Sequence, residues 1–215
     1  MPTTRLIFTR HGETDWNAGD RIQGHSDVEM NALGASQAEA LAERLAGTRI
    51  EAIYTSDLSR ALRTAEAVGR RLPDAAFIIA PELRERNWGA LEGLRWDEIR
   101  ETRPEEAAAI RSGDPAFAPA GGESKLQVRG RIAAFLDSVV EKHPGGTALA
   151  VTHGGVCVMI FRIILGLDLA LKVPFHVDNC SINIIDCENG SRIVKTLNCT
   201  CHLPDQLFGI APEFI

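Results

Sequence analysis

Short apolar runs alternate with helix-like segments along the chain, and this alternation most constrains the fold. Runs of strand-forming residues that end in polar or glycine turns predict strands at 5–9, 51–55, 77–80 and 147–152. Apolar residues at helical spacing predict helices at 35–45, 58–68, 97–112, 124–140 and 156–165. No linker or internal repeat interrupts the pattern. We therefore expect a single three-layer α/β/α domain over residues 1–215, with a mainly parallel sheet and helices on both faces.

Local features refine this expectation. Residues 15–30 are polar and contain two glycines, so they are expected to form a loop packed over the end of the first strand. Ser56 and Asp57 are expected to cap the helix that follows them, and Pro104 should interrupt the 97–112 helix. The segments 181–186 and 193–197 read as an antiparallel hairpin at the C-terminal end.

Charge and hydropathy exclude several classes of function. The 215 residues carry a formal net charge of −6, which argues against a nucleic-acid partner or a polybasic membrane surface. The first residues lead into a strand without an apolar leader, and the run 156–165 is too short to span a bilayer. We expect a cytoplasmic protein with no nucleic-acid or membrane partner.

The five cysteines raise the question of a metal site. Cys199-Thr200-Cys201-His202 resembles one half of a zinc site, but the remaining cysteines, Cys157, Cys180 and Cys187, supply no second closely spaced pair. An odd count in a chain with a cytosolic character favours reduced structural thiols. We expect no metal and no cofactor.

Polar residues cluster where the predicted strands end. Arg10 and His11 follow the first strand, and His153 follows the strand 147–152 before a glycine turn. Arg60 and Glu85 come after the two other strands. Carboxyl ends of parallel strands share one edge of a sheet, where ligands collect. The five side chains are therefore expected to meet there.

Each of these residues also has a purely structural interpretation. The Arg10-His11 pair suits a surface turn, and His153 suits a hydrogen-bonded core histidine. Arg60 has Glu66 within reach on its own helix, and Glu85 suits a solvated loop. Because these residues all follow strand ends, at four places in the chain, a shared functional site is favoured over these separate structural roles. His25, His143, His176 and His202 lack such placement and are expected to be structural.

Two histidines, two arginines and one carboxyl group suit phosphoryl transfer through a phosphohistidine. A neutral imidazole can attack phosphorus while guanidinium groups hold the equatorial oxygens. A protonated carboxyl group can donate its proton to the leaving oxygen. No metal is needed for charge neutralisation in such a site.

The motifs Arg10-His11-Gly12-Glu13-Thr14, 56–65, 85–89 and 152–155, in this order, resemble those of the histidine phosphatase superfamily, also called phosphoglycerate mutase-like. Residues 198–203 resemble the C-terminal segment of that family. The resemblance implies that His11 is the phosphorylated nucleophile and Glu85 the proton donor, with a phosphate pocket completed by Arg10, Arg60 and His153. It also implies phosphate or substrate contacts for Asn17, Gln23, Gly24 and Gly154.

The resemblance extends to both hydrolases and mutases. The segment 94–121 is short and its arginines are offset by acids, which suits a highly anionic bisphosphate poorly. Residues 121–124 resemble the hydrolase branch, whereas 83–91 are close to the mutase version. We expect a metal-independent phosphomonoesterase acting on a small phosphorylated metabolite. The alternatives are a cofactor-dependent phosphoglycerate mutase and a non-catalytic regulatory protein that binds a phosphorylated ligand. The hairpin and the tail 208–215 also allow a homodimer.

Overall fold

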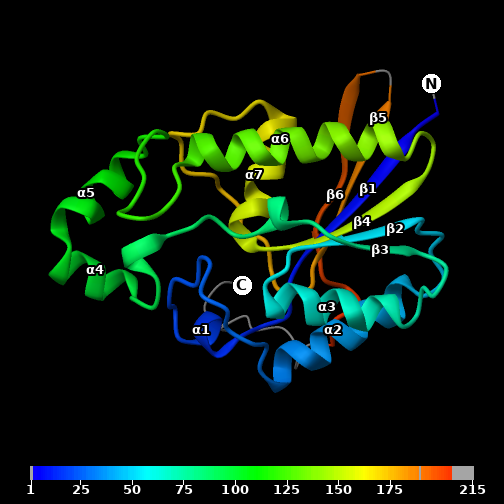
Figure 1. The fold of residues 1–215 in the computed structure, drawn as a ribbon, viewed down its shortest axis with the longest axis horizontal. Helices are drawn as coiled ribbons and strands as arrows, with labels where there is room; N and C mark the ends of the chain where they lie inside the picture. Colours follow the sequence, from blue (N-terminus) through cyan, green and yellow to red (C-terminus); the bar gives the residue numbers. More distant parts are fainter. Residues whose placement is uncertain (1, 189, 205–215) are drawn as a thin grey trace.

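The computed structural model describes residues 2–188 and 190–204, which contain a six-stranded sheet in the order β3-β2-β4-β1-β5-β6 (Figure 1). The strands are β1 (Thr4–Arg10), β2 (Ala52–Thr55), β3 (Ala76–Ile79), β4 (Thr147–Thr152), β5 (Ile182–Glu188) and β6 (Ser191–Cys199). The first four run parallel, whereas β5 is antiparallel to both β1 and β6. The predicted mainly parallel sheet with an antiparallel C-terminal hairpin is confirmed. The tail 208–215 lies outside the described residues.

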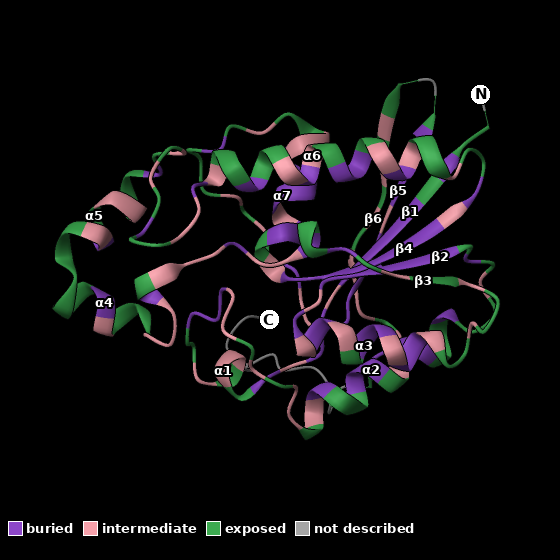
Figure 2. Cartoon of the chain, in the orientation of Figure 1, coloured by how far each residue is buried: buried purple, intermediate pink, exposed green. Residues whose placement is uncertain are grey.

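Helices cover both faces of the sheet, as the sequence predicts (Figures 1 and 2). The helices α2 (Ala32–Leu45) and α3 (Ser59–Gly69) pack on one face, and α6 (Lys125–Lys142) and α7 (Gly154–Leu165) on the other. Alternate residues of β1 serve the two layers: Leu6 and Phe8 join the core under α6 and α7, and Ile7 joins the core under α2 and α3. The central strands β1, β2 and β4 are therefore buried between two apolar cores, which explains their continuous apolar sequences, whereas the edge strands β3 and β6 are largely exposed.

A smaller lobe extends from one end of the sheet. It contains α4 (Trp96–Thr102) and α5 (Pro104–Ser112), with the break near Pro104 that the sequence predicts. Two short 3₁₀ turns, Pro81–Leu83 and Gly89–Leu91, precede the lobe. Its small core also includes Ile22, whose N–H donates to the carbonyl oxygen of Leu94 over 3.0 Å. The lobe is therefore attached to the segment that follows β1.

Two local predictions differ from the structure. The loop 15–30 contains a short helix, α1 (Asp15–Ala18), because Thr14 and Asn17 form a reciprocal capping box. The predicted cap of α3 at Ser56 and Asp57 is wrong, since the N-cap is Leu58.

Competition between charged partners explains the wrong cap. The carboxylate of Asp57 accepts a 2.7 Å hydrogen bond from Arg84 Nε, a charged donor that outcompetes a backbone N–H. Asp27 of the covering loop takes over at the helix terminus and accepts from the N–H of Ser59 over 2.7 Å.

Within the described ranges, no helix combines the length and apolar character needed to cross a membrane.

Two helical glycines should respond to alanine in opposite directions. A β-carbon at Gly34 in α2 would lie 2.1 Å from the carbonyl oxygen of Glu13. Gly34→Ala should therefore lower the free energy of unfolding by about 1–3 kcal/mol. Gly130 of α6 has no atom within 4 Å of such a carbon, so Gly130→Ala should raise it by about 0.4–1 kcal/mol. Urea unfolding of both variants measures the effect, and a stabilised Gly34→Ala protein would contradict this packing.

Candidate active site

The parallel strands bring the predicted residues to one edge of the sheet. Arg10, the last residue of β1, pairs with Thr152, the last residue of β4. His11 and His153 follow these two residues directly, so both lie at the same edge of the sheet. The rings of His11 and His153 lie with their centroids 5.1 Å apart, nearly edge to face. Arg60 follows β2 in the first turn of α3.

His11 is held as a neutral imidazole with one nitrogen available. It is buried, and its Nδ1 lies 2.8 Å from the carbonyl oxygen of Gly12, which assigns the proton to Nδ1 and leaves the lone pair on Nε2. Burial, with the nearby charges of Arg60 and Arg10, holds the pKa of His11 well below its usual value. A neutral, oriented imidazole is the form that a nucleophile requires.

His153 is also buried and neutral. Neither ring nitrogen has a hydrogen-bond partner among the described residues. Burial and the charge of Arg60 hold the pKa of His153 well below its usual value, and His11 adds to this shift. In the free protein His153 is therefore a hydrogen-bonding group rather than a cation.

The two arginines are anchored by neutral carbonyl oxygens. Arg60 donates from Nη1 to Ser26 and from Nη2 to Gly24, each over 2.8 Å, and Arg10 donates from Nη1 to Val177 over 3.0 Å. Burial lowers the pKa of Arg60 to about 10, so it remains a cation at neutral pH. Both charges stay available to an anion, because no carboxylate in the described chain pairs with either side chain. The structural interpretation of Arg60 is wrong: Glu66 instead pairs with Arg63 at 3.1 Å.

Glu85 points its carboxyl group at the start of α7. Its Oε2 accepts a 2.8 Å hydrogen bond from the N–H of Gly155, and its Oε1 accepts a 2.7 Å bond from the N–H of Arg86. The carboxyl group of Glu85 is therefore held at the start of α7, the helix that follows His153. This differs from the freely solvated loop acid that a purely structural interpretation would expect.

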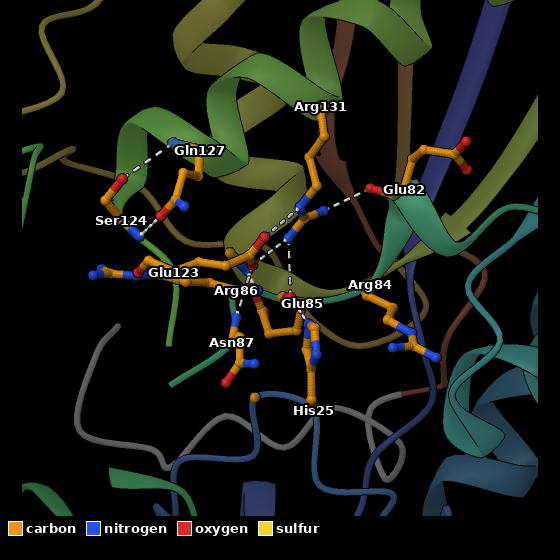
Figure 3. A network of polar contacts seen from close by, with 12 residues as sticks. His25, Glu82, Arg84, Glu85, Arg86, Asn87, Glu123, Ser124, Gln127 and Arg131 are labelled. Atoms are coloured by element: carbon orange, nitrogen blue, oxygen red, sulfur yellow. Dashed lines mark hydrogen bonds and ion pairs between the residues drawn. The ribbon is translucent and has the colours of Figure 1, made fainter. Parts of the chain in front are cut away.

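The backbone around Glu85 is fixed by a polar network (Figure 3). Its carbonyl oxygen accepts from Arg131 Nη2 at 3.0 Å and from His25 Nε2 at 2.9 Å. Arg131 also pairs with Glu123 at 3.0 Å, and Glu123 accepts from the N–H of Asn87 at 2.9 Å. The network joins α6, the covering loop and the segment that carries the acid.

A cleft of about 460 Å³ collects these groups. Its walls contain eight of the nine predicted site residues, Arg10, His11, Asn17, Gln23, Gly24, Arg60, Glu85 and Gly154. His153 is 1% exposed and lies behind the wall, against His11. Gly24 contributes its carbonyl oxygen to Arg60, and Asn17, the third residue of α1, accepts from the N–H of the N-cap Thr14 in the capping box.

Sequence reasoning missed most of the outer wall, which is made by Trp16, Asp20, Arg21, Ile22, Trp88, Trp96, Gly155, Val158, Phe175, His176 and Val177. Two of the histidines expected to be structural are near the site: His176 lines the cleft, and His25 supports Glu85. His143 and His202 lie elsewhere, hydrogen-bonded to Tyr54 and to the carbonyl of Cys180. The segment 166–180 has no periodic pattern that would have placed Phe175 or His176.

The cysteine-rich segment shows no assembled metal site. The sulfur atoms of Cys199 and Cys201 lie 2.9 Å apart as free thiols, while Nε2 of His202 is directed to the carbonyl of Cys180. No group of three potential ligands that would hold a metal ion occurs among residues 2–188 and 190–204.

The fold and cleft define an α/β protein with paired histidines and carbonyl-anchored arginines at the carboxyl edge of its sheet. The family model of the histidine phosphatase superfamily (branch 1) matches residues 6–200, and the chain belongs to this family.

The named relatives of this chain include both a phosphatase and a mutase-like protein. The chain is 37% identical to the metal-independent phosphoserine phosphatase of Arabidopsis thaliana, over 93% of this chain and 83% of the relative. It is 40% identical to phosphoglycerate mutase-like protein 4 of the same plant, over 87% and 81%. A phosphoserine phosphatase variant from Entamoeba histolytica, solved in complex with phosphoserine, superposes with a TM-score of 0.84 at 27% identity, over 94% of this chain and all of the other.

The buried histidines should make stability depend on pH. The pKa values of His11 and His153 lie well below the ordinary 6.5, so the unfolded chain binds these protons first. Their contribution is therefore present above about pH 6.5 and is lost as the pH falls toward the folded-state values, by at most about 1.4 kcal/mol per pH unit and histidine. Urea unfolding at about pH 7.5 and about pH 5.5 measures this slope. In His153→Asn the slope should be smaller, and an unchanged slope would show that this imidazole is not buried neutral.

Proposed function

We propose that the protein is a metal-independent phosphomonoesterase that hydrolyses small phosphorylated metabolites through a phosphohistidine on His11. One observation carries the proposal. The neutral imidazole of His11, with Nε2 unprotonated, lies between two arginines that have no carboxylate partner and faces the cleft that also holds Glu85. This combination supplies a nucleophile, an anion pocket and a proton donor.

In the first step, Nε2 of His11 attacks phosphorus. The bond from phosphorus to the leaving oxygen breaks with its electron pair on oxygen, and Glu85 in its protonated form transfers its proton there. Arg10 and Arg60 stabilise the charge on the equatorial oxygens. His153, neutral in the free protein, offers a ring N–H to one of them.

In the second step, water attacks the phosphohistidine. The Glu85 carboxylate takes a proton from the water, the phosphorus–nitrogen bond breaks, and its electron pair returns to Nε2. Inorganic phosphate leaves, and the carboxyl group is protonated again for the next cycle. No group outside the chain is needed for this balance.

The lobe favours hydrolysis over mutase activity. A mutase must hold a bisphosphate, which requires unpaired cations at the cleft. In the lobe, Arg95 pairs with Asp97 at 3.3 Å, Arg103 with Glu106 at 3.6 Å, and Arg21 of the cleft wall with Glu98 at 3.5 Å. The similarity to phosphoserine phosphatases points the same way. A purely regulatory phosphate binder would need neither the nucleophile nor the proton donor.

The cellular location and the partners of the protein are also proposals. We infer a cytoplasmic protein, because all five cysteines are free thiols and three of them are buried. Its partner would be a small phosphorylated metabolite, and a homodimer remains a prediction.

Replacement of the nucleophile tests the mechanism. His11→Ala should reduce release of phosphate from an aryl phosphate by more than about a thousandfold, because no covalent intermediate forms. Acid-labile labelling of the protein by a phosphorylated substrate should disappear as well. His143→Ala, at the opposite end of the sheet, is the matched control and should retain both. Labelling that survives in His11→Ala would disprove the assignment.

Replacement of the proton donor should discriminate between leaving groups. Glu85→Gln cannot protonate the leaving oxygen, so kcat/KM for alkyl phosphates should fall by about 100-fold to 10,000-fold. Aryl phosphates leave without a proton and should lose much less. The control is Glu82→Gln, since only the backbone carbonyl of this exposed residue contacts the network. Equal losses for both substrate types would rule out the acid role of Glu85.

A product assay separates the hydrolase from the mutase. With 3-phosphoglycerate and a catalytic amount of bisphosphoglycerate, we expect free phosphate to accumulate. Formation of 2-phosphoglycerate without free phosphate would establish the mutase instead.

A further inference from the structure

Two thiols lie side by side where β6 ends. The sulfur atoms of Cys199 and Cys201 are 2.9 Å apart, and both residues are free cysteines. A disulfide bond is about 2.05 Å long, so a shift of less than about 1 Å would close a bond between them. Cys201 is exposed and Cys199 is half-buried, whereas the other three cysteines are buried. A reagent in solution can therefore reach this pair of thiols.

The contact between the two sulfur atoms decides which of them reacts first. A thiolate rather than a thiol attacks a disulfide. The hydrogen bond from Cys201 lowers the pKa of the Cys199 thiol, and the charge of Arg44 in the last turn of α2 lowers it further. The same contact raises the pKa of Cys201. Cys199 is thus the attacking thiolate, and Cys201 is held against it in position to close the bond.

We propose that Cys199 and Cys201 form a reversible disulfide by exchange with a small disulfide such as oxidised glutathione. The Cys199 thiolate attacks one sulfur of the small disulfide, and the other sulfur leaves with the electron pair of the broken bond. This leaving thiolate takes the proton of Cys201, whose sulfur then attacks Cys199 and releases the second small thiolate. The second thiolate takes up the proton that Cys199 had given to water. The protein dithiol is oxidised, and one small disulfide is reduced to two thiols.

The position of the pair favours a reversible bond over a permanent one. Exposed disulfides are the labile kind, and they are reduced again when thiols are in excess. Disulfides of this kind in the cytosol are transient or redox-sensing. The free thiols in the structure and the proposed cytoplasmic location are therefore the reduced half of one exchange equilibrium.

The residues on either side of the pair hold the segment 177–180. The Oδ1 of Asn198 accepts a 2.8 Å hydrogen bond from the N–H of Asp178, and its Nδ2 donates to Oδ2 of Asp178 at 2.6 Å. After the pair, Nε2 of His202 lies 3.1 Å from the carbonyl oxygen of Cys180. A bond between the two sulfur atoms draws these two anchors of the segment together.

The same segment holds the phosphate pocket. The carbonyl oxygen of Val177 accepts from Arg10 Nη1 at 3.0 Å, and the N–H of Cys180 donates to the carbonyl of Arg10 at 2.9 Å. Nδ2 of Asn179 donates to the carbonyl of His11 at 2.7 Å. Displacement of the segment therefore moves a pocket arginine and the backbone of the nucleophile, and a misplacement of about 1 Å can cost about 100-fold in rate. Oxidation should weaken the site. This effect on turnover rests on the proposed function, whereas the disulfide itself does not.

Thiol counting tests the disulfide without any enzyme assay. The full chain is incubated with reduced and oxidised glutathione at a series of ratios, quenched with acid, denatured and titrated. The number of thiols should fall from five to three, and the intact mass should fall by two hydrogen atoms. Dithiothreitol should reverse both changes.

Serine variants locate the bond. Cys199→Ser and Cys201→Ser cannot close it and should instead gain the mass of one glutathione. Cys187→Ser, which removes a buried thiol in β5, is the matched control and should still lose two thiols.

Phosphate binding and turnover test the link to the cleft. Oxidation should raise the Kd for inorganic phosphate, measured by calorimetry, about tenfold, and should lower kcat/KM for p-nitrophenyl phosphate by at least about tenfold. The double variant Cys199→Ser/Cys201→Ser should match the reduced wild-type protein, because neither residue lines the cleft, and it should not respond to oxidised glutathione.

Two results would overturn the proposal. Retention of all five thiols at every glutathione ratio, or a final product that carries bound glutathione, would exclude the disulfide. A disulfide that leaves the phosphate Kd and kcat/KM unchanged would exclude its link to the cleft. If the reduced protein releases no phosphate from any substrate, the proposed function fails, while the thiol count and the phosphate Kd still decide this inference.

Discussion

The parallel pairing of β1 with β4 is the constraint on which the site depends. The N–H of His11 donates to the carbonyl of Thr152 over 2.9 Å, so the pairing extends past β1 to His11 itself, opposite the residue that precedes His153. A slip of one residue would turn Leu6, Ile7 and Phe8 to the wrong layers, and both buried cores oppose it. The burial of alternate apolar residues in two different cores thereby fixes the strand register, and the register fixes the distance between His11 and His153.

The two arginines of the cleft, Arg10 and Arg60, are held by neutral backbone carbonyl groups, so their positive charges remain available to a bound anion. Arg60 binds the carbonyls of Ser26 and Gly24, which fixes the guanidinium and folds the covering loop over it at the same time. A carboxylate in place of these carbonyls would neutralise the charge that an arriving phosphate needs. Several surface arginines show the opposite arrangement: Arg84, for example, is paired with the carboxylate of Asp57.

Much of this architecture follows from the sequence, because its causes are local or periodic. Apolar runs predict the strands, helical spacing predicts α2, α6 and α7, and parallel order predicts a common edge for the residues that follow the strands. The missed features depend on contacts between distant aperiodic segments. Asp27 reaches α3 only because the covering loop folds back, and His176 reaches the cleft from a segment without a pattern. Local sequence carries no signal for such contacts.

The carboxyl group of Glu85 is positioned by the backbone rather than by an ion pair. Its Oε1 and Oε2 accept from the N–H groups of Arg86 and Gly155, and its carbonyl oxygen accepts from Arg131 and His25. Gly155 belongs to the first turn of α7, whose N-cap is His153. The turn that follows β4 therefore places one imidazole and also fixes the carboxyl group beside it, so that the strand register sets the position of the proton donor as well as that of the two histidines.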